Sequence, residues 1–183
     1  MKILKTVFLT LLIWSNCLGQ TSVVDYDFIN SALKQVEKYD TTYFLLQNKS
    51  YRCYLLDNKT EFYIKDLNGK IDNETLKEII RNSHTTSSND LEFDAKLISR
   101  KIGAKLISPS LVDSMQNKED ISQPLNKRLF YICSMPVFDN KKTYAVIDFG
   151  GGTKRLAMQG KKYLFKRTKS EWILIATFDS WIS

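Results

Sequence analysis

Hydrophobic residues recur at helical spacing in two stretches of the chain. The first predicts a helix over residues 26–38, with Asp25 as its N-cap and Val24 packing against Ile29 at its start. Its apolar face consists of Ile29, Ala32, Leu33 and Val36. The second predicts a helix that begins after Asp72, with a face formed by Leu76, Ile79 and Ile80.

Runs of aromatic and β-branched residues, separated by turn-forming residues, predict strands. In the first half these runs predict a meander of strands at residues 43–47, 51–56 and 61–65. In the last third they predict consecutive antiparallel strands at residues 128–135, 142–149, 161–167 and 171–178. The turns between these strands are assigned to Asp139-Asn140, Gly150-Gly151-Gly152, Gly160 and Lys169-Ser170.

The middle of the chain has a weaker pattern. Residues 91–108 fit either helix or strand, and their end, 105–108, suits an edge strand before Pro109. A short helical turn is expected at 110–116. The polar stretches at 83–90 and 117–126 are interpreted as loops.

These elements predict an α+β fold, a curved antiparallel sheet with a few packed helices. A cystatin-like cone, in which a helix packs in a curved sheet, is one candidate arrangement and is based on element order alone. Both alternating sets of residues in 171–178 are apolar, so this strand is expected to be central and covered on both faces. The expected core joins Ile29, Leu33 and Val36 to Phe130, Ile132, Ala145, Ile147, Trp172, Leu174 and Ile175.

The N-terminal residues have the pattern of a secretory signal peptide. Lys2 and Lys5 precede a short apolar run at residues 7–14, and small residues, Cys17 and Gly19, follow it. Residues 1–19 are therefore expected to be removed and residues 20–183 to form a single α+β domain, periplasmic or secreted. The net charge then falls from +7 to +5. The run at residues 7–14 is too short to span a membrane, and no second apolar run approaches that length.

Cysteines leave two questions open. Cys17 allows the alternative of a lipoprotein anchored through this residue, but Trp14 and Asn16 depart from the lipobox pattern and only Ser15 fits it. Cys53 and Cys133 form either a disulfide, which is favoured by an oxidising compartment, or two buried thiols. We expect the thiols.

The sequence lacks the residues and motifs that most catalytic mechanisms require. His84 is the only histidine, so no metal site is expected. There is no Gly-x-Ser-x-Gly nucleophile motif, and Gly150-Gly151-Gly152-Thr153-Lys154 departs from the phosphate-loop pattern. The sequence therefore assigns no catalytic residue, no metal ligand and no cofactor.

Basic residues are concentrated near the C-terminus. Residues 141–169 hold nine lysines and arginines against one acid, Asp148. This predicts a patch that binds an anionic polymer, although lysines also protect strand edges from pairing. Export makes nucleic acid a poor candidate partner. The predicted patch consists of Lys142, Lys154, Arg155, Lys161, Lys162 and Arg167.

The C-terminal part also resembles a known group of proteins. Its motifs are Ser134-Met135-Pro136-Val137-Phe138, then Tyr144-Ala145-Val146-Ile147, a glycine-rich turn, Trp172-Ile173-Leu174 and the closing Trp181-Ile182-Ser183. Over residues 97–183 this pattern is similar to a group of uncharacterised exported bacterial proteins. The resemblance implies export and an α+β fold, and no activity.

Three functions are consistent with this picture. The favoured one is a non-catalytic exported domain that binds a ligand or a protein partner through its sheet face or loops. The first alternative is a hydrolase that uses carboxylates such as Asp148 or Asp179, because carboxylate chemistry leaves little trace in a sequence. The second is an inhibitor or immunity-type protein with an exposed aromatic patch.

Overall fold

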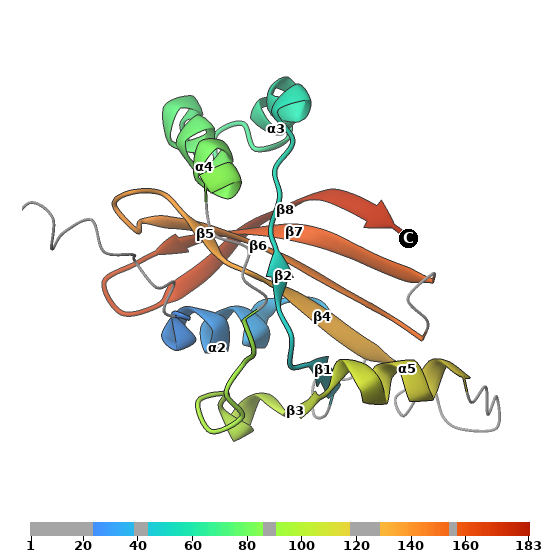
Figure 1. The fold of residues 1–183 in the computed structure, drawn as a ribbon. Helices are drawn as coiled ribbons and strands as arrows, with labels where there is room; N and C mark the ends of the chain where they lie inside the picture. The colour runs from blue at the N-terminus through green and yellow to red at the C-terminus, as the bar shows by residue number, and fades with distance from the viewer. Residues whose placement is uncertain (1–23, 39–43, 86–90, 118–128, 154–156) are drawn as a thin grey trace, which may run out of the picture.

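The computed structural model describes residues 24–38, 44–85, 91–117, 129–153 and 157–183. The predicted signal segment and Cys17 lie outside these residues. In the described part, four α-helices pack around an open eight-stranded sheet, so the α+β class is confirmed (Figure 1). No helix there is both long enough and apolar enough to cross a membrane.

The bounds of the elements are as follows. The helices are α2 (Tyr26–Gln35), α3 (Thr60–Asp66), α4 (Asn73–Thr85) and α5 (Pro109–Asn117), with 3-10 turns at Asp57–Lys59 and Arg100–Ile102. The strands are β1 (Phe44–Gln47), β2 (Tyr51–Arg52), β3 (Ala104–Ile107), β4 (Phe130–Met135), β5 (Val137–Phe138), β6 (Tyr144–Gly152), β7 (Met158–Arg167) and β8 (Trp172–Ile182).

The sheet is mixed. Its strand order is β3-β1-β4-β6-β7-β8, with β2 beside β4 and β5 beside β6. The strands from β4 to β8 pair antiparallel, as predicted, whereas β1 runs parallel to β3 and β4, and β2 runs parallel to β4. The predicted N-terminal meander is therefore wrong, because β1 and β2 pair with a distant strand and not with each other. The likeness to a cone stays a prediction.

Residues 61–65 form α3 and not the predicted strand. Their aromatic and β-branched composition suits a strand, but Tyr63 and Leu67 lie four apart and are both buried beneath the helix. In Figure 1, α3 and α4 cover one face of the sheet and α2 covers the other. The packing surface available to this segment overrides its local strand preference.

The predicted helix ends and edge elements are mostly confirmed. Asp25 accepts a hydrogen bond from the Phe28 N–H and Asp72 accepts one from the Thr75 N–H, so both act as N-caps. α2 ends at Gln35, three residues early, because Val36 turns to an extended conformation in the core. β3 is the expected edge strand and α5 the expected helical turn.

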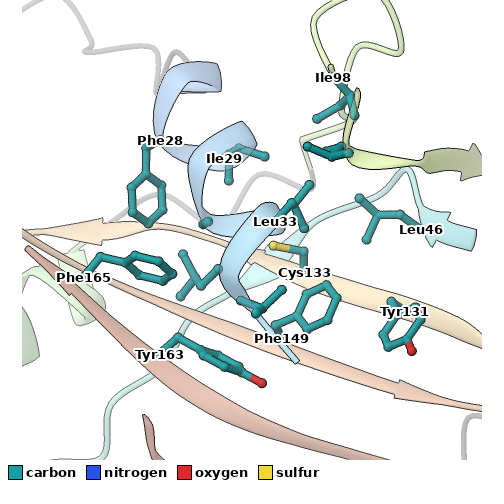
Figure 2. Packing of buried hydrophobic residues seen from close by; sticks show 14 of the residues in the cluster. Phe28, Ile29, Leu33, Leu46, Ile98, Tyr131, Cys133, Phe149, Tyr163 and Phe165 are labelled. Atoms are coloured by element: carbon teal, nitrogen blue, oxygen red, sulfur yellow. The ribbon is translucent and has the colours of Figure 1, made fainter. Parts of the chain in front are cut away.

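The core is divided by the sheet, so the single cluster that was expected is only partly correct. Under α2, Phe28, Ile29 and Leu33 face Phe149 and Phe165 (Figure 2). Ala145, Ile147 and Trp172 belong to the same cluster. Phe130 and Ile132 belong to a second cluster beside α5, and Ile175 to a third beside α3 and α4. Successive residues of a strand face opposite sides of the sheet, which separates neighbours such as Leu174 and Ile175.

β8 is an edge strand and not the central strand that was predicted. Helices cover both of its faces: Trp172 packs under α2, and Phe178 packs under α3. Trp172 and Phe178 belong to the same alternating set and reach opposite faces because the register of β8 shifts between them, whereas Ile173 of the other set is 39% exposed. β8 nevertheless pairs with β7 alone.

The glycines assigned to turns lie inside paired strands. Gly150 pairs with Gly160 in the β6–β7 ladder, and both lie beneath the Trp181 ring. A Cβ at Gly160 would lie 2.4 Å from that ring, and one at Gly150 would lie 2.7 Å from it. The assignment of these glycines to turns is therefore wrong, because Gly150 lies in β6 and Gly160 in β7. The glycines make room for a side chain.

Candidate functional site

The two carboxylates named as candidates from the sequence, Asp148 of β6 and Asp179 of β8, lie on the same face of the sheet. Lys162 of β7, the strand between them, contacts both. Its Nζ lies 2.9 Å from Asp179 Oδ2 and 3.5 Å from Asp148 Oδ2. All three side chains are less than a tenth exposed, so this is a buried ionic cluster.

A β-bulge places Asp179 in this cluster. Gly160 pairs with Trp181 and Lys162 pairs with Phe178, so Asp179 and Ser180 together lie opposite one residue of β7. Asp179 adopts a left-handed backbone conformation with φ 47°, which is uncommon for a residue other than glycine. The bulge lets Phe178, Asp179 and Trp181 all contact groups on the same side of the sheet.

Asp179 has the more complete set of partners. The Lys59 Nζ lies 2.8 Å from its Oδ1, and the Tyr63 hydroxyl donates to its Oδ2 at 3.0 Å. Burial by itself raises the pKa of this carboxyl, but hydrogen bonds from Lys59 and Lys162 outweigh that effect and the pKa is lowered. Asp179 is therefore an ionised acceptor at neutral pH.

Asp148 is in a different environment. Its Oδ1 accepts a hydrogen bond from the Trp181 indole Nε1 at 2.7 Å, and its backbone N–H donates to the Ser134 hydroxyl at 2.8 Å. Burial raises the pKa of Asp148, because the lowering effect of Lys162 and Trp181 is smaller than the cost of desolvation. The site thus shifts its two carboxyl groups in opposite directions.

A cleft of about 360 Å³ opens over this cluster, and we call it the polar cleft. Trp181, Tyr51 and the cluster form its inner part. Tyr54 and Leu56 line its exposed rim, where their side chains are 45% and 38% exposed. The polar cleft therefore combines buried charges inside with aromatic and apolar groups at its opening.

The Tyr51 hydroxyl lies at the inner end of the polar cleft. It is shielded from water and makes no hydrogen bond of ordinary geometry, although it lies near Asp148. Burial, followed by the charge of Asp148, raises the pKa of Tyr51 well above its usual value. A buried hydroxyl without a good partner costs about 1–3 kcal/mol, so this position is an unsatisfied donor beside an acceptor.

Cys53 and Cys133, the two cysteines among the described residues, are free thiols, as expected. Cys53 packs with the cluster under α3 and α4, and Cys133 packs with the cluster under α2. Burial raises the pKa of Cys53 to about 12 and raises that of Cys133 as well. Neither is an activated nucleophile, because reactivity requires the thiolate.

A second hollow, of about 640 Å³, is also lined by Trp181, and we call it the apolar groove. Its walls are aromatic, and glycine backbone forms part of its lining. Lys161, which is paired with Glu37 at 2.8 Å, lies at its border. The walls include Tyr131, Phe149, Tyr163 and Trp181, with Gly150, Gly151 and Gly160 between them.

The four predicted anion-binding residues that the structure describes do not lie together. Lys162 is buried in the ionic cluster, and Lys161 faces the opposite side of the sheet. Arg167 and Lys142 lie at the far end of β7, about 16 Å from Lys162 at ~3.3 Å per residue. Lys154 and Arg155 lie outside the described residues. Anion binding by these residues stays a prediction.

His84 lies in the last turn of α4, although it was expected in a loop. Its Nε2 lies 3.2 Å from Asp57 Oδ1, and its ring packs against Tyr54. Among the described residues, no group of three or more His, Cys, Asp or Glu side chains is placed to hold a metal ion. Through its contact with Tyr54, the His84 ring packs against the rim of the polar cleft.

Sequence reasoning missed the roles of Lys162, Tyr51 and Trp181. One signal was available: Asp148 is the only acid in a basic stretch and lies in an otherwise apolar strand. A buried carboxylate requires a partner of opposite charge or several hydrogen bonds. That rule predicts a buried lysine on a neighbouring strand but does not identify which one.

Comparison of the chain with protein-family models, with curated proteins and with solved structures gives no match.

Proposed function

We propose that this protein is an exported domain that binds a small molecule in the polar cleft without transforming it. One observation carries the proposal. A bulged edge strand turns Asp179 toward Asp148 and Lys162, at the bottom of a cleft whose rim is open. The volume, about 360 Å³, is at the lower end of the range of about 300–1,000 Å³ for small-molecule sites.

A purely structural role accounts poorly for this arrangement. Buried ion pairs add little net stability, because desolvation offsets most of their attraction. A left-handed residue other than glycine adds a further cost of about 1–3 kcal/mol. Features of this kind, together with oppositely shifted carboxyl groups, are concentrated at functional sites.

Export is the second part of the proposal. It is supported by the charged and apolar pattern of residues 1–19 and by the resemblance of residues 97–183 to exported bacterial proteins. Fusion of residues 1–19 to a reporter enzyme tests it. We expect the reporter to be found outside the cytoplasm, and its retention in the cytoplasm would contradict export.

Binding is tested with two matched variants at exposed aromatic residues. Tyr54 lines the polar cleft and is 45% exposed, whereas Phe62 is 52% exposed and does not line it. A library of small polar molecules is screened by the thermal shift of the purified protein. Tyr54→Ala should reduce the shift caused by a hit and Phe62→Ala should leave it unchanged. If both variants changed the thermal shift equally, the ligand would bind outside the polar cleft.

Hydrolysis by the two carboxylates is the second candidate. The opposite pKa shifts of Asp148 and Asp179 favour it, because an acid and a base need separated pKa values. However, both carboxylates contact the same Lys162 nitrogen, so an ammonium group occupies the space where a scissile bond would lie. Turnover of chromogenic glycosides or esters that is lost in Asp148→Asn would favour hydrolysis over binding.

A further inference from the structure

We infer that the ligand of the polar cleft is a neutral sugar of about one ring, an inference that rests on the proposed binding function. Charge balance, the aromatic lining, and the donor and acceptor left at the inner end support it.

The ionic cluster is balanced without a ligand. Two ammonium groups, Lys59 and Lys162, face two carboxylates, Asp148 and Asp179. A charged ligand would leave an uncompensated charge in a site where three of these side chains are less than a tenth exposed. A zwitterion would have to compete with ion pairs already formed at 2.8 and 2.9 Å. A neutral molecule avoids both costs.

The lining suits a ring with an apolar face and a polar rim. Trp181 and Tyr54 provide aromatic surface, and Leu56 adds apolar surface at the opening. Aromatic side chains bury large apolar areas while their polar atoms keep a hydrogen bond, as the Trp181 indole does with Asp148. A sugar ring presents C–H groups to such a surface and keeps its hydroxyl groups at the edge.

The inner end has one donor and one acceptor in need of better partners. The Tyr51 hydroxyl makes no hydrogen bond of ordinary geometry, and the nearest Lys162 contact to Asp148 is long, at 3.5 Å. A hydroxyl group both donates and accepts, so a single sugar hydroxyl can bridge this pair once the Tyr51 side chain, whose oxygen is shielded from water, turns toward the cleft. Lys59, with its side chain 43% exposed, is available to a second hydroxyl nearer the rim.

The test uses the tryptophan side chains of the whole chain as reporters. The chain has three tryptophans, and Trp181→Phe identifies the indole N–H signal of Trp181 in a ¹⁵N NMR spectrum. Hexoses and N-acetylhexosamines are titrated in parallel with amino acids and with short dicarboxylates. We expect a neutral sugar to shift the Trp181 signal and to leave the signal of Trp172, which packs under α2 on the opposite face, in place.

Two tyrosine variants sharpen the test. Tyr51→Phe removes the hydroxyl at the inner end and should weaken sugar binding about five- to ten-fold. Tyr144→Phe, in β6 outside the cleft lining, should leave the affinity unchanged. A shift of the Trp181 signal by amino acids or dicarboxylates but not by sugars would overturn the ligand class and keep the site. No shift with any of these probes would overturn both the ligand class and the proposed function.

Discussion

Lys161 and Lys162 follow each other in β7, yet their ammonium groups lie on opposite faces of the sheet. Lys161 pairs with Glu37 beside α2, and both side chains are well exposed, at 38% and 63%. Lys162 is 8% exposed and contacts Asp148 and Asp179. Two adjacent residues of the same type therefore have different environments.

This contrast predicts the effect of removing each charge. Lys162→Met leaves two buried carboxylates without their shared partner and should lower the free energy of unfolding by about 3–5 kcal/mol. Lys161→Met breaks an exposed pair and should cost less than about 1 kcal/mol. Urea denaturation at neutral pH measures both. Equal losses would show that the buried cluster has no special energetic weight.

Asp179 should make stability depend on acid. Its pKa is lower in the folded protein, so its contribution is present above the pKa of the unfolded chain and is lost as pH falls through the folded value. The difference in unfolding free energy between wild type and Asp179→Asn should be largest near neutral pH and should shrink in acid. Asp66→Asn, at an exposed position of α3, is the control for the removal of one carboxylate from the chain.

Asp148 should act in the opposite sense. Its pKa is raised by burial, so the protonated form is favoured in the folded state and stability falls as pH rises through the folded value. As the pH rises from the pKa of the unfolded chain through the higher pKa of the folded protein, the unfolding free energy of the wild type should fall relative to that of Asp148→Asn. A parallel pair of stability curves would contradict the raised pKa.

The glycine at position 160 should be intolerant of any side chain. Its Cβ would lie 2.4 Å from the Trp181 ring, so Gly160→Ala should cost about 1–3 kcal/mol through overpacking. The double variant Gly160→Ala with Trp181→Leu should cost less than the sum of the two single changes. Thermal unfolding of all three proteins measures this coupling, and simple additivity would argue against the contact.

Both buried thiols should be unreactive in the folded protein. Cys53 and Cys133 are at most 1% exposed, and burial raises the pKa of both. A thiol reagent at pH 8 should modify neither residue until denaturant is added, and then both. The mass of a proteolytic digest that keeps Cys53 and Cys133 should be the same with and without reductant. A difference of two protons would reveal a disulfide.

Trp172 should be a major source of stability in the cluster under α2. Its ring packs edge-to-face on Phe28, with the ring centres 5.0 Å apart, and is 5% exposed. Trp172→Ala should cost about 3–5 kcal/mol in unfolding free energy. Ile182→Ala, at an 85% exposed position of the same strand, is the control and should be nearly neutral.

The sequence by itself determined the elements whose signals are local. α2 and α4 begin at the residues expected, because an N-cap and the spacing of an apolar face are properties of a few consecutive residues. The β-branched and aromatic runs of the last third were likewise sufficient to locate the antiparallel strands. Asp148 and Asp179 were singled out as carboxylates, without any means to place them together.

The tertiary structure decided everything that depends on a distant partner. Residues 61–65 form α3, in which Tyr63 packs against Phe178 of β8. Gly150 and Gly160 lie in paired strands, where the absence of a side chain leaves room for the Trp181 ring. The polar cleft is lined by residues of β2, β4, β6, β7 and β8 and of the segment between β2 and α3, and the bulge in β8 places Asp179 beside Lys162. Strand register and bulges arise from pairing between segments far apart in the chain, and no local pattern encodes them.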